Sequence, residues 1–389
     1  MKAIIHVGDM KAGSKSIQTF LLENRQLLQD AGVYVSEETR VGPYHSMLCS
    51  YAFDDSRMEN NPRREWGITD ISQMEEHRHD VHEKIKNEVA NLEPGTHSVV
   101  FSHEGLLSLD GAEVARVMQL LRTYFSEIRI VAYIRRQDKH FVSMWGQRIN
   151  SGQSPGPNFF QMLRNSRSYV AMLANWEQAV GLENLAVRVL ESKSFLNGNL
   201  YQDFCAAAGI PWNDQFEQSN ASNVGLNPVA QTFLIALNQR LAAKGVPTIT
   251  PRSGVIPFLQ QYFTGNGTVP SRAWALETVE FFAKENEEIC RRYFPDQTSL
   301  FDDNFDSYPI NGTPPCTAAE AFDLAVTMWE HFHQGPTELE VRQAYRLILG
   351  RAPTPDEVAT QTQANASVKG LYMGLLRSQK KPLKETSGK

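Results

Sequence analysis

Short apolar runs alternate with longer amphipathic stretches over the first 210 residues of the chain. The longer stretches repeat apolar residues at helical spacing, whereas the short runs are rich in Val, Ile and Phe, as buried strands are. Strands that alternate with helices form parallel βαβ units, so we expect an α/β fold with a doubly wound parallel sheet. The predicted strands cover residues 3–7, 32–35, 98–102, 128–134 and 185–190. The first predicted helix follows the loop after the first strand and ends at about residue 29. The other predicted helices cover residues 71–92, 110–124, 137–149 and 200–208.

Helical patterns continue after the last predicted strand, and one stretch interrupts them. Residues 301–315 are rich in Pro, Gly and Asp and form a candidate boundary. We therefore expect an α/β domain over residues 1–310 and a small all-helical module over residues 317–389. The polar tail from Lys380 onward is expected to be disordered.

The composition is that of an ordinary soluble globular protein, with 41% hydrophobic and 21% charged residues. The net charge of −6 argues against a general nucleic-acid binder, so any anion site must be local. No apolar run approaches the ~18–20 residues of a membrane span, and the first strand follows without a signal segment. Four cysteines are widely spaced and form no Cys-x-x-Cys pair, which favours free thiols in a reducing cytoplasm.

Three histidines, His77, His79 and His82, lie close together on a highly charged predicted helix. Their spacing places imidazoles on different helix faces, and no carboxylate pattern typical of a metal site accompanies them. We therefore expect a solvated helix face there and no metal site.

A loop of small residues between the first strand and the first helix carries the first candidate chemistry. Backbone N–H groups in such a loop, together with a helix N-terminus, favour an anion such as phosphate. The loop is not a Walker A motif, because Ser14 separates Gly13 from Lys15. Its sequence is Gly8-Asp9-Met10-Lys11-Ala12-Gly13-Ser14-Lys15-Ser16.

A second polar group follows the strand at residues 128–134. Arg135 stands at the end of that strand, and Ser143 follows eight residues later in the next predicted helix. A guanidinium binds phosphate oxygens in a fork, and a hydroxyl donates a further bond. Ligands of doubly wound sheets bind at the carboxyl ends of the strands, where the first loop, Arg135 and residues 102–104 are all expected.

These two motifs, in this order, resemble those of sulfotransferases that use the donor 3′-phosphoadenylyl sulfate (PAPS), in particular the bacterial branch. The loop resembles the family's Lys-x-Gly-[Ser/Thr]-x-Ser, and weaker similarity extends over roughly residues 1–305. The resemblance implies a P-loop-like nucleotide-binding turn, PAPS as co-substrate and adenosine 3′,5′-bisphosphate as product. The chain departs from the family at Ala12, where Thr is usual, and at Lys15, where Ser or Thr is usual.

The resemblance also implies roles for individual residues. Lys11 would act catalytically at the bridging oxygen of the donor, and Arg135 with Ser143 would hold the 3′-phosphate. The remaining donor-binding positions would be Ala12, Gly13, Ser14, Lys15 and Ser16. No metal is required by this chemistry.

The base that takes the acceptor proton is expected after the third strand or in the polar stretch of residues 36–66. Glu104 is the first choice, His103 the second and His45 the third. Side chains alternate along an extended segment, so only one of Glu104 and His103 is expected to point into the site. Ser102 or His103 is alternatively a cap for the following helix.

The acceptor and the oligomeric state are left open by the sequence. Residues 341–353 resemble a short helical module appended to bacterial enzymes that modify glycans or cell-surface polymers. That resemblance favours a carbohydrate or surface-polymer hydroxyl, or an amine, on a glycan or lipid-linked acceptor; the alternative is an ordinary helix capped at Gly350.

Two other functions remain open at this point. A P-loop kinase for a small molecule would use ATP and Mg²⁺, but the displaced lysine and the lack of a strand that ends in a metal-binding Asp argue against it. A non-catalytic binding protein on a decayed sulfotransferase fold is favoured by Ala12 and Lys15.

Overall fold

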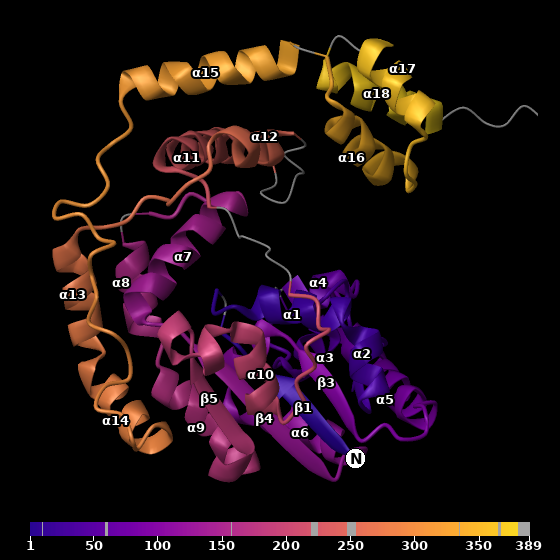
Figure 1. The fold of residues 1–389 in the computed structure, drawn as a ribbon, viewed down its shortest axis with the longest axis vertical. Coiled ribbons are helices and arrows are strands. Elements are labelled where there is room, and N and C mark those ends of the chain that lie inside the picture. The colour runs from indigo at the N-terminus through magenta and orange to yellow at the C-terminus, as the bar shows by residue number, and fades with distance from the viewer. Residues whose placement is uncertain are drawn as a thin grey trace, which may run out of the picture. The chain divides into compact units, whose positions relative to one another are not determined.

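The structure, a computed structural model, contains a five-stranded, all-parallel sheet with the strand order β2-β3-β1-β4-β5 (Figure 1). The α/β fold and the five strands predicted from the sequence are thereby confirmed. The structure describes residues 1–9, 11–58, 61–156, 158–218, 225–246, 254–333, 335–364 and 367–379. The strands are β1 (Lys2–His6), β2 (Val33–Val35), β3 (Ser98–Ser102), β4 (Glu127–Ile134) and β5 (Leu185–Val189).

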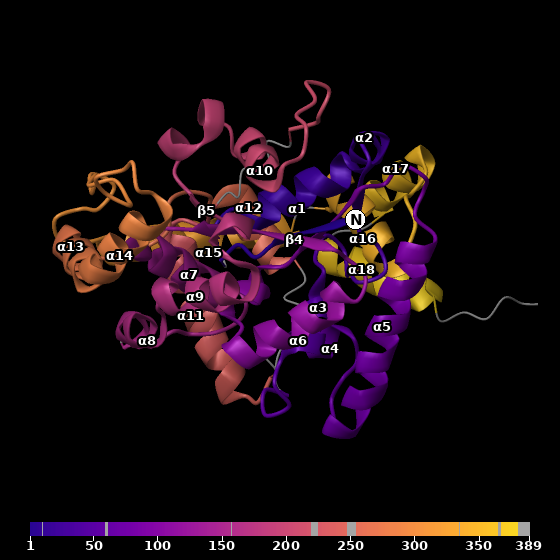
Figure 2. The ribbon, with the colours of Figure 1, turned by 90° about the horizontal axis from the view of Figure 1, so that it is seen from below.

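Helices cover both faces of the sheet, as the alternation of buried side chains along β1 requires. Ile5 packs on one face with apolar residues of α3, α5, α6 and α9, and Ile4 packs on the other with those of α1, α2 and α10 (Figure 2). These helices are α1 (Ser14–Glu23), α2 (Arg25–Asp30), α3 (Ser46–Ala52), α5 (Met74–Ala90), α6 (Gly111–Arg122), α9 (Tyr169–Val180) and α10 (Leu200–Ala208).

The structure differs from the prediction at the first helix, which is broken at Asn24. The Asn24 side chain donates to the carbonyls of Phe20 and Glu217, at 2.9 and 2.8 Å, and accepts from the Glu217 N–H at 2.7 Å. An amide that bonds the backbone of a distant segment competes with the helix ladder, so α1 ends and α2 begins at this residue.

The polar stretch of residues 36–66, for which no helix was predicted, contains α3 and α4 (Asn61–Glu65). Every residue of α3 is buried, and its apolar side chains join the core on one face of the sheet. The helix therefore depends on tertiary burial rather than on a periodic pattern, which is why the sequence did not indicate it.

The described residues form two compact units. The first contains the sheet and is built from residues 1–145, 156–223 and 270–312. The second is built from residues 146–155, 224–269 and 313–389. The predicted domain boundary between residues 310 and 317 stays a prediction, and the tail from Lys380 lies outside the described residues.

The remaining helices complete the two units. Helices α7 (Gln137–Asn150), α8 (Phe159–Ser166), α13 (Arg272–Phe281) and α14 (Ala283–Tyr293) follow β4 and β5 in the chain. The second unit includes α11 (Pro228–Ala243), α12 (Val255–Tyr262), α15 (Ala318–His333), α16 (Glu338–Leu349), α17 (Pro355–Ala364) and α18 (Val368–Gln379).

The C-terminal helices surround a small apolar core of their own, which contains Val341, Tyr345, Val358 and Leu371. Helix α16 begins with a capping box at Thr337 and ends at a left-handed Gly350, so its limits follow from local chemistry. No helix in the described ranges has the length and apolar character of a membrane span.

Candidate functional site

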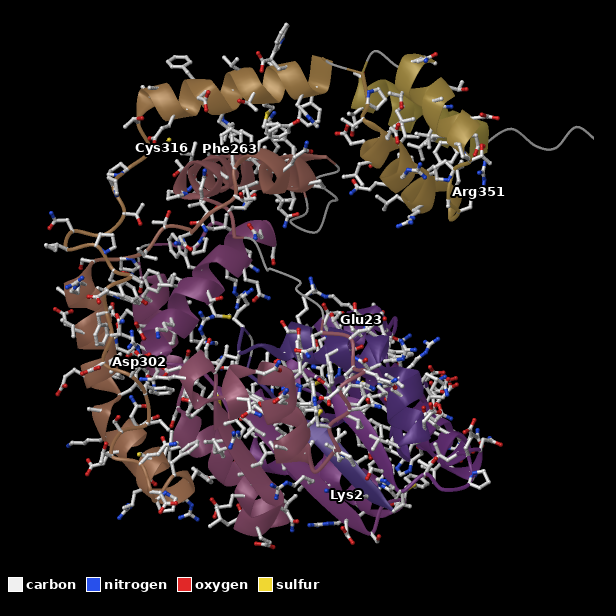
Figure 3. The ribbon with its side chains drawn as sticks, in the orientation of Figure 1. Lys2, Glu23, Phe263, Asp302, Cys316 and Arg351 are labelled. Carbon is white, nitrogen blue, oxygen red and sulfur yellow. The ribbon has the colours of Figure 1, made fainter. Side chains whose placement is uncertain are left out.

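The candidate site lies at the carboxyl ends of β1, β3 and β4, which are neighbours in the sheet. Lys2, labelled in Figure 3, marks the opposite, amino end of β1. The Arg135 Nη1 donates to the Lys11 carbonyl at 3.1 Å, and the Gln18 Nε2 donates to the Glu104 Oε2 at 3.1 Å. The loop after β1, the end of β4 and the turn after β3 therefore meet, as doubly wound sheets require of a ligand site.

The loop after β1 is a tight turn whose shape is fixed by backbone bonds. The Asp9 N–H donates to the Tyr133 carbonyl at 3.0 Å, and the Ala12 N–H donates to the Asp9 carbonyl at 3.0 Å. Lys11 has a φ of +66° and Gly13 a φ of +81°, so the chain turns through the left-handed region twice. At Gly13 a Cβ would also lie 2.8 Å from the Leu190 side chain, so only glycine fits there.

Gly8 is a second position in this loop where a side chain has no room. A Cβ on Gly8 would lie 2.5 Å from the Ser14 Oγ and 2.6 Å from the His6 Nε2, both of which are buried. We expect Gly8→Ala to lower the free energy of unfolding by about 1–3 kcal/mol, because the loop must move off this buried pair. Urea unfolding measures the change, and Gly156→Ala is the control, since nothing lies within 4 Å of the Cβ it would add. Equal stability of the two variants would contradict this account of the loop.

Three cations gather at the site: Lys11, Lys15 and Arg135. Burial lowers the pKa of the Lys11 ammonium, the charges of Arg135 and Lys15 lower it further, and Glu104 opposes them. Burial also lowers the pKa of the Arg135 guanidinium. Among the described residues, Arg135 has one hydrogen bond, to the carbonyl of Lys11, and none to a carboxylate. A half-buried guanidinium without a carboxylate partner in the described part of the chain, beside two lysines, is suited to an anion.

The hydroxyl groups predicted to contact the donor differ in their availability. The Ser14 Oγ is buried and donates to the Asp9 carbonyl at 3.2 Å, so Ser14 has only its backbone N–H left to offer an anion. Ser16 and Ser143 are half-buried, and Ser143 stands in the second turn of α7. Ala12 is fully buried and contributes backbone alone, whereas Lys15 is exposed.

Of the three candidate bases, Glu104 has the geometry that suits the role best. Its carboxylate is half-buried, and the Gln18 amide orients it through Oε2. It also lies close enough to Lys11 to oppose the lowering of that lysine's pKa. Tyr44 is a further neighbour, since burial first and then the Glu104 charge raise the pKa of its hydroxyl.

His103 and His45 are held by the backbone instead. The His103 Nδ1 accepts from the Gly105 N–H at 2.9 Å and caps the 3₁₀ turn of residues 104–108, the alternative role considered for it. The His45 Nδ1 accepts from the Ser102 N–H, and its Nε2 lies 2.9 Å from the Ser36 carbonyl, to which it donates. His45 is 1% exposed, and burial lowers its pKa to about 4. Its ring therefore ties residues 36–45 to β3.

A buried cluster around Asp9 was not anticipated from the sequence. The Tyr169 hydroxyl donates to the Asp9 Oδ2 at 2.7 Å, Arg167 forms an ion pair with Oδ1, and the His140 Nδ1 lies 3.3 Å from Oδ2. Burial alone would lower the pKa of Arg167, but the Asp9 carboxylate outweighs it and raises the pKa. A carboxylate inside a loop predicted to bind an anion was the available signal, because a buried charge requires a counter-charge.

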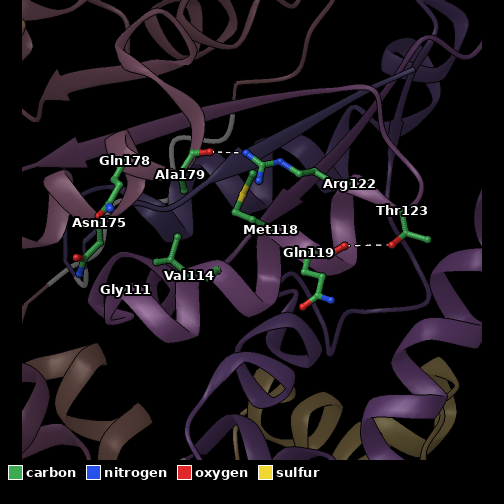
Figure 4. Close-up of a pocket in the computed structure, with 10 residues that line it drawn as sticks. Gly111, Val114, Met118, Gln119, Arg122, Thr123, Asn175, Gln178 and Ala179 are labelled. Atoms are coloured by element: carbon green, nitrogen blue, oxygen red, sulfur yellow. Dashed lines mark hydrogen bonds between the residues drawn. The ribbon is translucent and has the colours of Figure 1, made fainter.

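A separate groove of about 720 Å³ runs between α6 and α9 (Figure 4). Its lining includes one charged side chain, Arg122, which donates to the Ala179 carbonyl. None of its lining residues belongs to the loop after β1 or to the end of β4. The groove offers no paired acid and base, so we assign it no chemistry.

No family model matches the chain. A curated relative, an uncharacterized protein of Archaeoglobus fulgidus, is 27% identical over 202 residues, which cover 50% of this chain and 54% of the relative. The chain thus spans about half the length of the curated relative it matches.

Two solved structures are similar to this one. A sulfotransferase from Alicyclobacillus acidocaldarius has a TM-score of 0.37 and 13% identity, with 62% of this chain and 94% of that chain covered. The sulfotransferase domain of the Synechococcus PCC 7002 olefin synthase has a TM-score of 0.33 and 13% identity. The match covers 73% of this chain and 94% of that domain. The structural similarity found is therefore to bacterial sulfotransferases, at low TM-scores.

Proposed function

We propose that the protein is a sulfotransferase that moves a sulfuryl group from PAPS to a hydroxyl or amine of an acceptor. One observation carries the proposal: Arg135, a half-buried guanidinium whose one hydrogen bond among the described residues goes to a carbonyl, contacts the loop that presents Lys11 and Lys15. Two separate cationic centres at one strand edge are suited to a nucleotide that carries phosphate at both its 5′ and 3′ positions.

The donor would be held from both sides. The loop N–H groups, the α1 N-terminus, Lys11 and Lys15 would bind the 5′-phosphosulfate, with the Ser16 hydroxyl as a further donor. Arg135 and the Ser143 hydroxyl would bind the 3′-phosphate.

Transfer would be an in-line displacement at sulfur. The acceptor oxygen or nitrogen attacks the sulfur, the bond from sulfur to the bridging oxygen breaks, and adenosine 3′,5′-bisphosphate leaves. Negative charge grows on the bridging oxygen, and Lys11 is the cation that would stabilise it. Glu104 would take the proton of the acceptor. We propose a glycan or lipid-linked acceptor on the basis of the C-terminal module, and a cytoplasmic location.

Titration calorimetry with adenosine 3′,5′-bisphosphate, without metal, tests the proposal. We expect the wild type to bind and Arg135→Ala to bind about 100-fold more weakly, because the 3′-phosphate would lose its counter-charge. Arg129→Ala is the matched control: Arg129 lies near the amino end of β4 and also donates to carbonyls, those of Ala207 and Glu183. We expect its affinity to stay within twofold of the wild type.

The same experiment separates the alternatives. No binding by a folded wild type would overturn the sulfotransferase proposal, and tight binding of ATP with Mg²⁺ instead would favour the kinase. Binding of the bisphosphate without turnover of PAPS in the presence of hydroxyl and amine acceptors would favour a non-catalytic role.

A further inference from the structure

We propose that Asp9, Arg167 and Tyr169 form a brace that sets the spacing between Lys11 and Arg135 and so selects nucleotides phosphorylated at both ends of the ribose. The inference rests on the proposed function, since it assigns the two cations to the 5′ and 3′ phosphates. The three residues are called the donor brace below.

Asp9 is the centre of the donor brace because all of its polar groups are used inside the protein. Its N–H donates to the Tyr133 carbonyl, and its carbonyl accepts from the Ala12 N–H and the Ser14 hydroxyl. Its carboxylate is held by Arg167, Tyr169 and His140, and the residue is 2% exposed. The loop is therefore fixed at Asp9, two residues before the left-handed Lys11.

Tyr169 connects this loop to the other half of the site. Its hydroxyl lies 2.7 Å from the Asp9 Oδ2 and 3.1 Å from the carbonyl of Arg135, and the side chain is buried. One oxygen atom thus touches both the loop that presents Lys11 and the backbone of Arg135. The hydroxyl has one proton to share between these two acceptors. A shift of either acceptor therefore changes the hydrogen bond to the other, which couples the two positions.

The charge of Asp9 is compatible with an anion site only because the donor brace neutralises it. The Arg167 guanidinium pairs with Oδ1, and its own pKa is raised by that carboxylate against the effect of burial. Asp9 therefore acts on the donor through geometry rather than through its charge, and the cations left to meet the ligand are Lys11, Lys15 and Arg135.

A ligand senses the spacing of two groups only when it binds both of them. Adenosine 3′,5′-bisphosphate would contact Lys11 and Arg135 together, whereas adenosine 5′-monophosphate would contact the loop alone. A change that loosens the donor brace should therefore lower the affinity for the bisphosphate and leave the affinity for the monophosphate unchanged. If Tyr169 had a merely structural role, its substitution would lower the affinities for both ligands by the same factor.

Tyr169→Phe removes the bridging hydroxyl and keeps the ring. We expect the affinity for adenosine 3′,5′-bisphosphate to fall about tenfold and that for adenosine 5′-monophosphate to stay within twofold. Titration calorimetry measures the first ligand, and competition against it measures the weaker second one.

The chain offers a matched control in Tyr293. Its hydroxyl donates to the Glu177 Oε2 at 2.7 Å, and Arg292 forms an ion pair with the same carboxylate, so the trio resembles the donor brace chemically. None of these three residues belongs to the loop after β1 or to the end of β4. We expect Tyr293→Phe to leave both affinities within twofold of the wild type.

The outcomes separate the inference from the proposed function. If the wild type binds neither nucleotide, both are overturned. If the wild type binds the bisphosphate and Tyr169→Phe matches it, or loses both ligands in proportion, the donor brace alone is overturned. Should Tyr169→Phe fail to fold, Arg167→Lys provides the second test, because lysine keeps a counter-charge for Asp9 but loses the fork geometry of the guanidinium. We expect a smaller selective loss of affinity for the bisphosphate, and a proportional loss of both affinities would contradict the inference.

Discussion

Glu104→Gln is expected to lower kcat for PAPS turnover about 1,000-fold while leaving the affinity for adenosine 3′,5′-bisphosphate within twofold of the wild type. The amide keeps the size of the side chain and its contact with Gln18 but cannot accept the acceptor proton. In the described part of the chain, Gln18 bonds Oε2 and no hydrogen bond reaches Oε1, which leaves that oxygen for the acceptor. Release of the bisphosphate from PAPS, measured with hydroxyl and amine acceptors, gives kcat.

His103→Asn is the companion variant, because asparagine retains an acceptor for the Gly105 N–H and so preserves the cap. We expect kcat to fall less than tenfold. A larger loss from His103→Asn than from Glu104→Gln would assign the proton transfer to the histidine and contradict our choice of base.

Acidification is expected to unfold the protein between pH 6.5 and pH 4. Burial lowers the pKa of His6 to about 3 and those of His45 and His77 to about 4, from an ordinary value of 6.5. These rings are neutral in the folded protein and protonated in the unfolded chain at pH 5. The unfolded chain therefore binds more protons, and the free energy of unfolding decreases as the pH is lowered. Each ring contributes about 2 kcal/mol to the loss between pH 7 and pH 5. Three such losses are comparable to the whole stability of a typical domain.

Urea unfolding at pH 7, 6 and 5 measures this loss, and one helix provides the matched pair. His77 is buried and its Nε2 lies 2.7 Å from the Ser50 Oγ, whereas His79 is exposed. His77→Gln is expected to reduce the pH dependence by about one bound proton, and His79→Gln to leave it unchanged. An unchanged slope for His77→Gln would contradict the role of this ring.

The sequence predicted the parts of the fold that depend on local pattern. All five strands follow from short apolar runs, and the meeting of the loop, Glu104 and Arg135 follows from their places at strand ends. The prediction of a solvated face was wrong for His77, because a polar partner on α3 allows this ring to be buried. Composition along α5 could not show that partner.

The rest of the site depends on contacts between distant segments, which no periodicity encodes. Arg167 and Tyr169 reach Asp9 across about 160 residues of sequence. Likewise, Asn24 breaks the first helix because Glu217 is there to be bonded. His45 could be named as a candidate base from its residue type, but its two backbone partners become visible only once residues 36–45 are placed against β3.

The pairing of Asp9 with Arg167 has a consequence for how this protein can evolve. Loss of either residue alone leaves an uncompensated buried charge, whereas replacement of both by apolar residues of similar volume is far less costly. The two positions are therefore expected to change together: a homologue that keeps a carboxylate at position 9 should also keep a cation at position 167. A single substitution at either site is strongly disfavoured, although the two sites lie about 160 residues apart in the sequence.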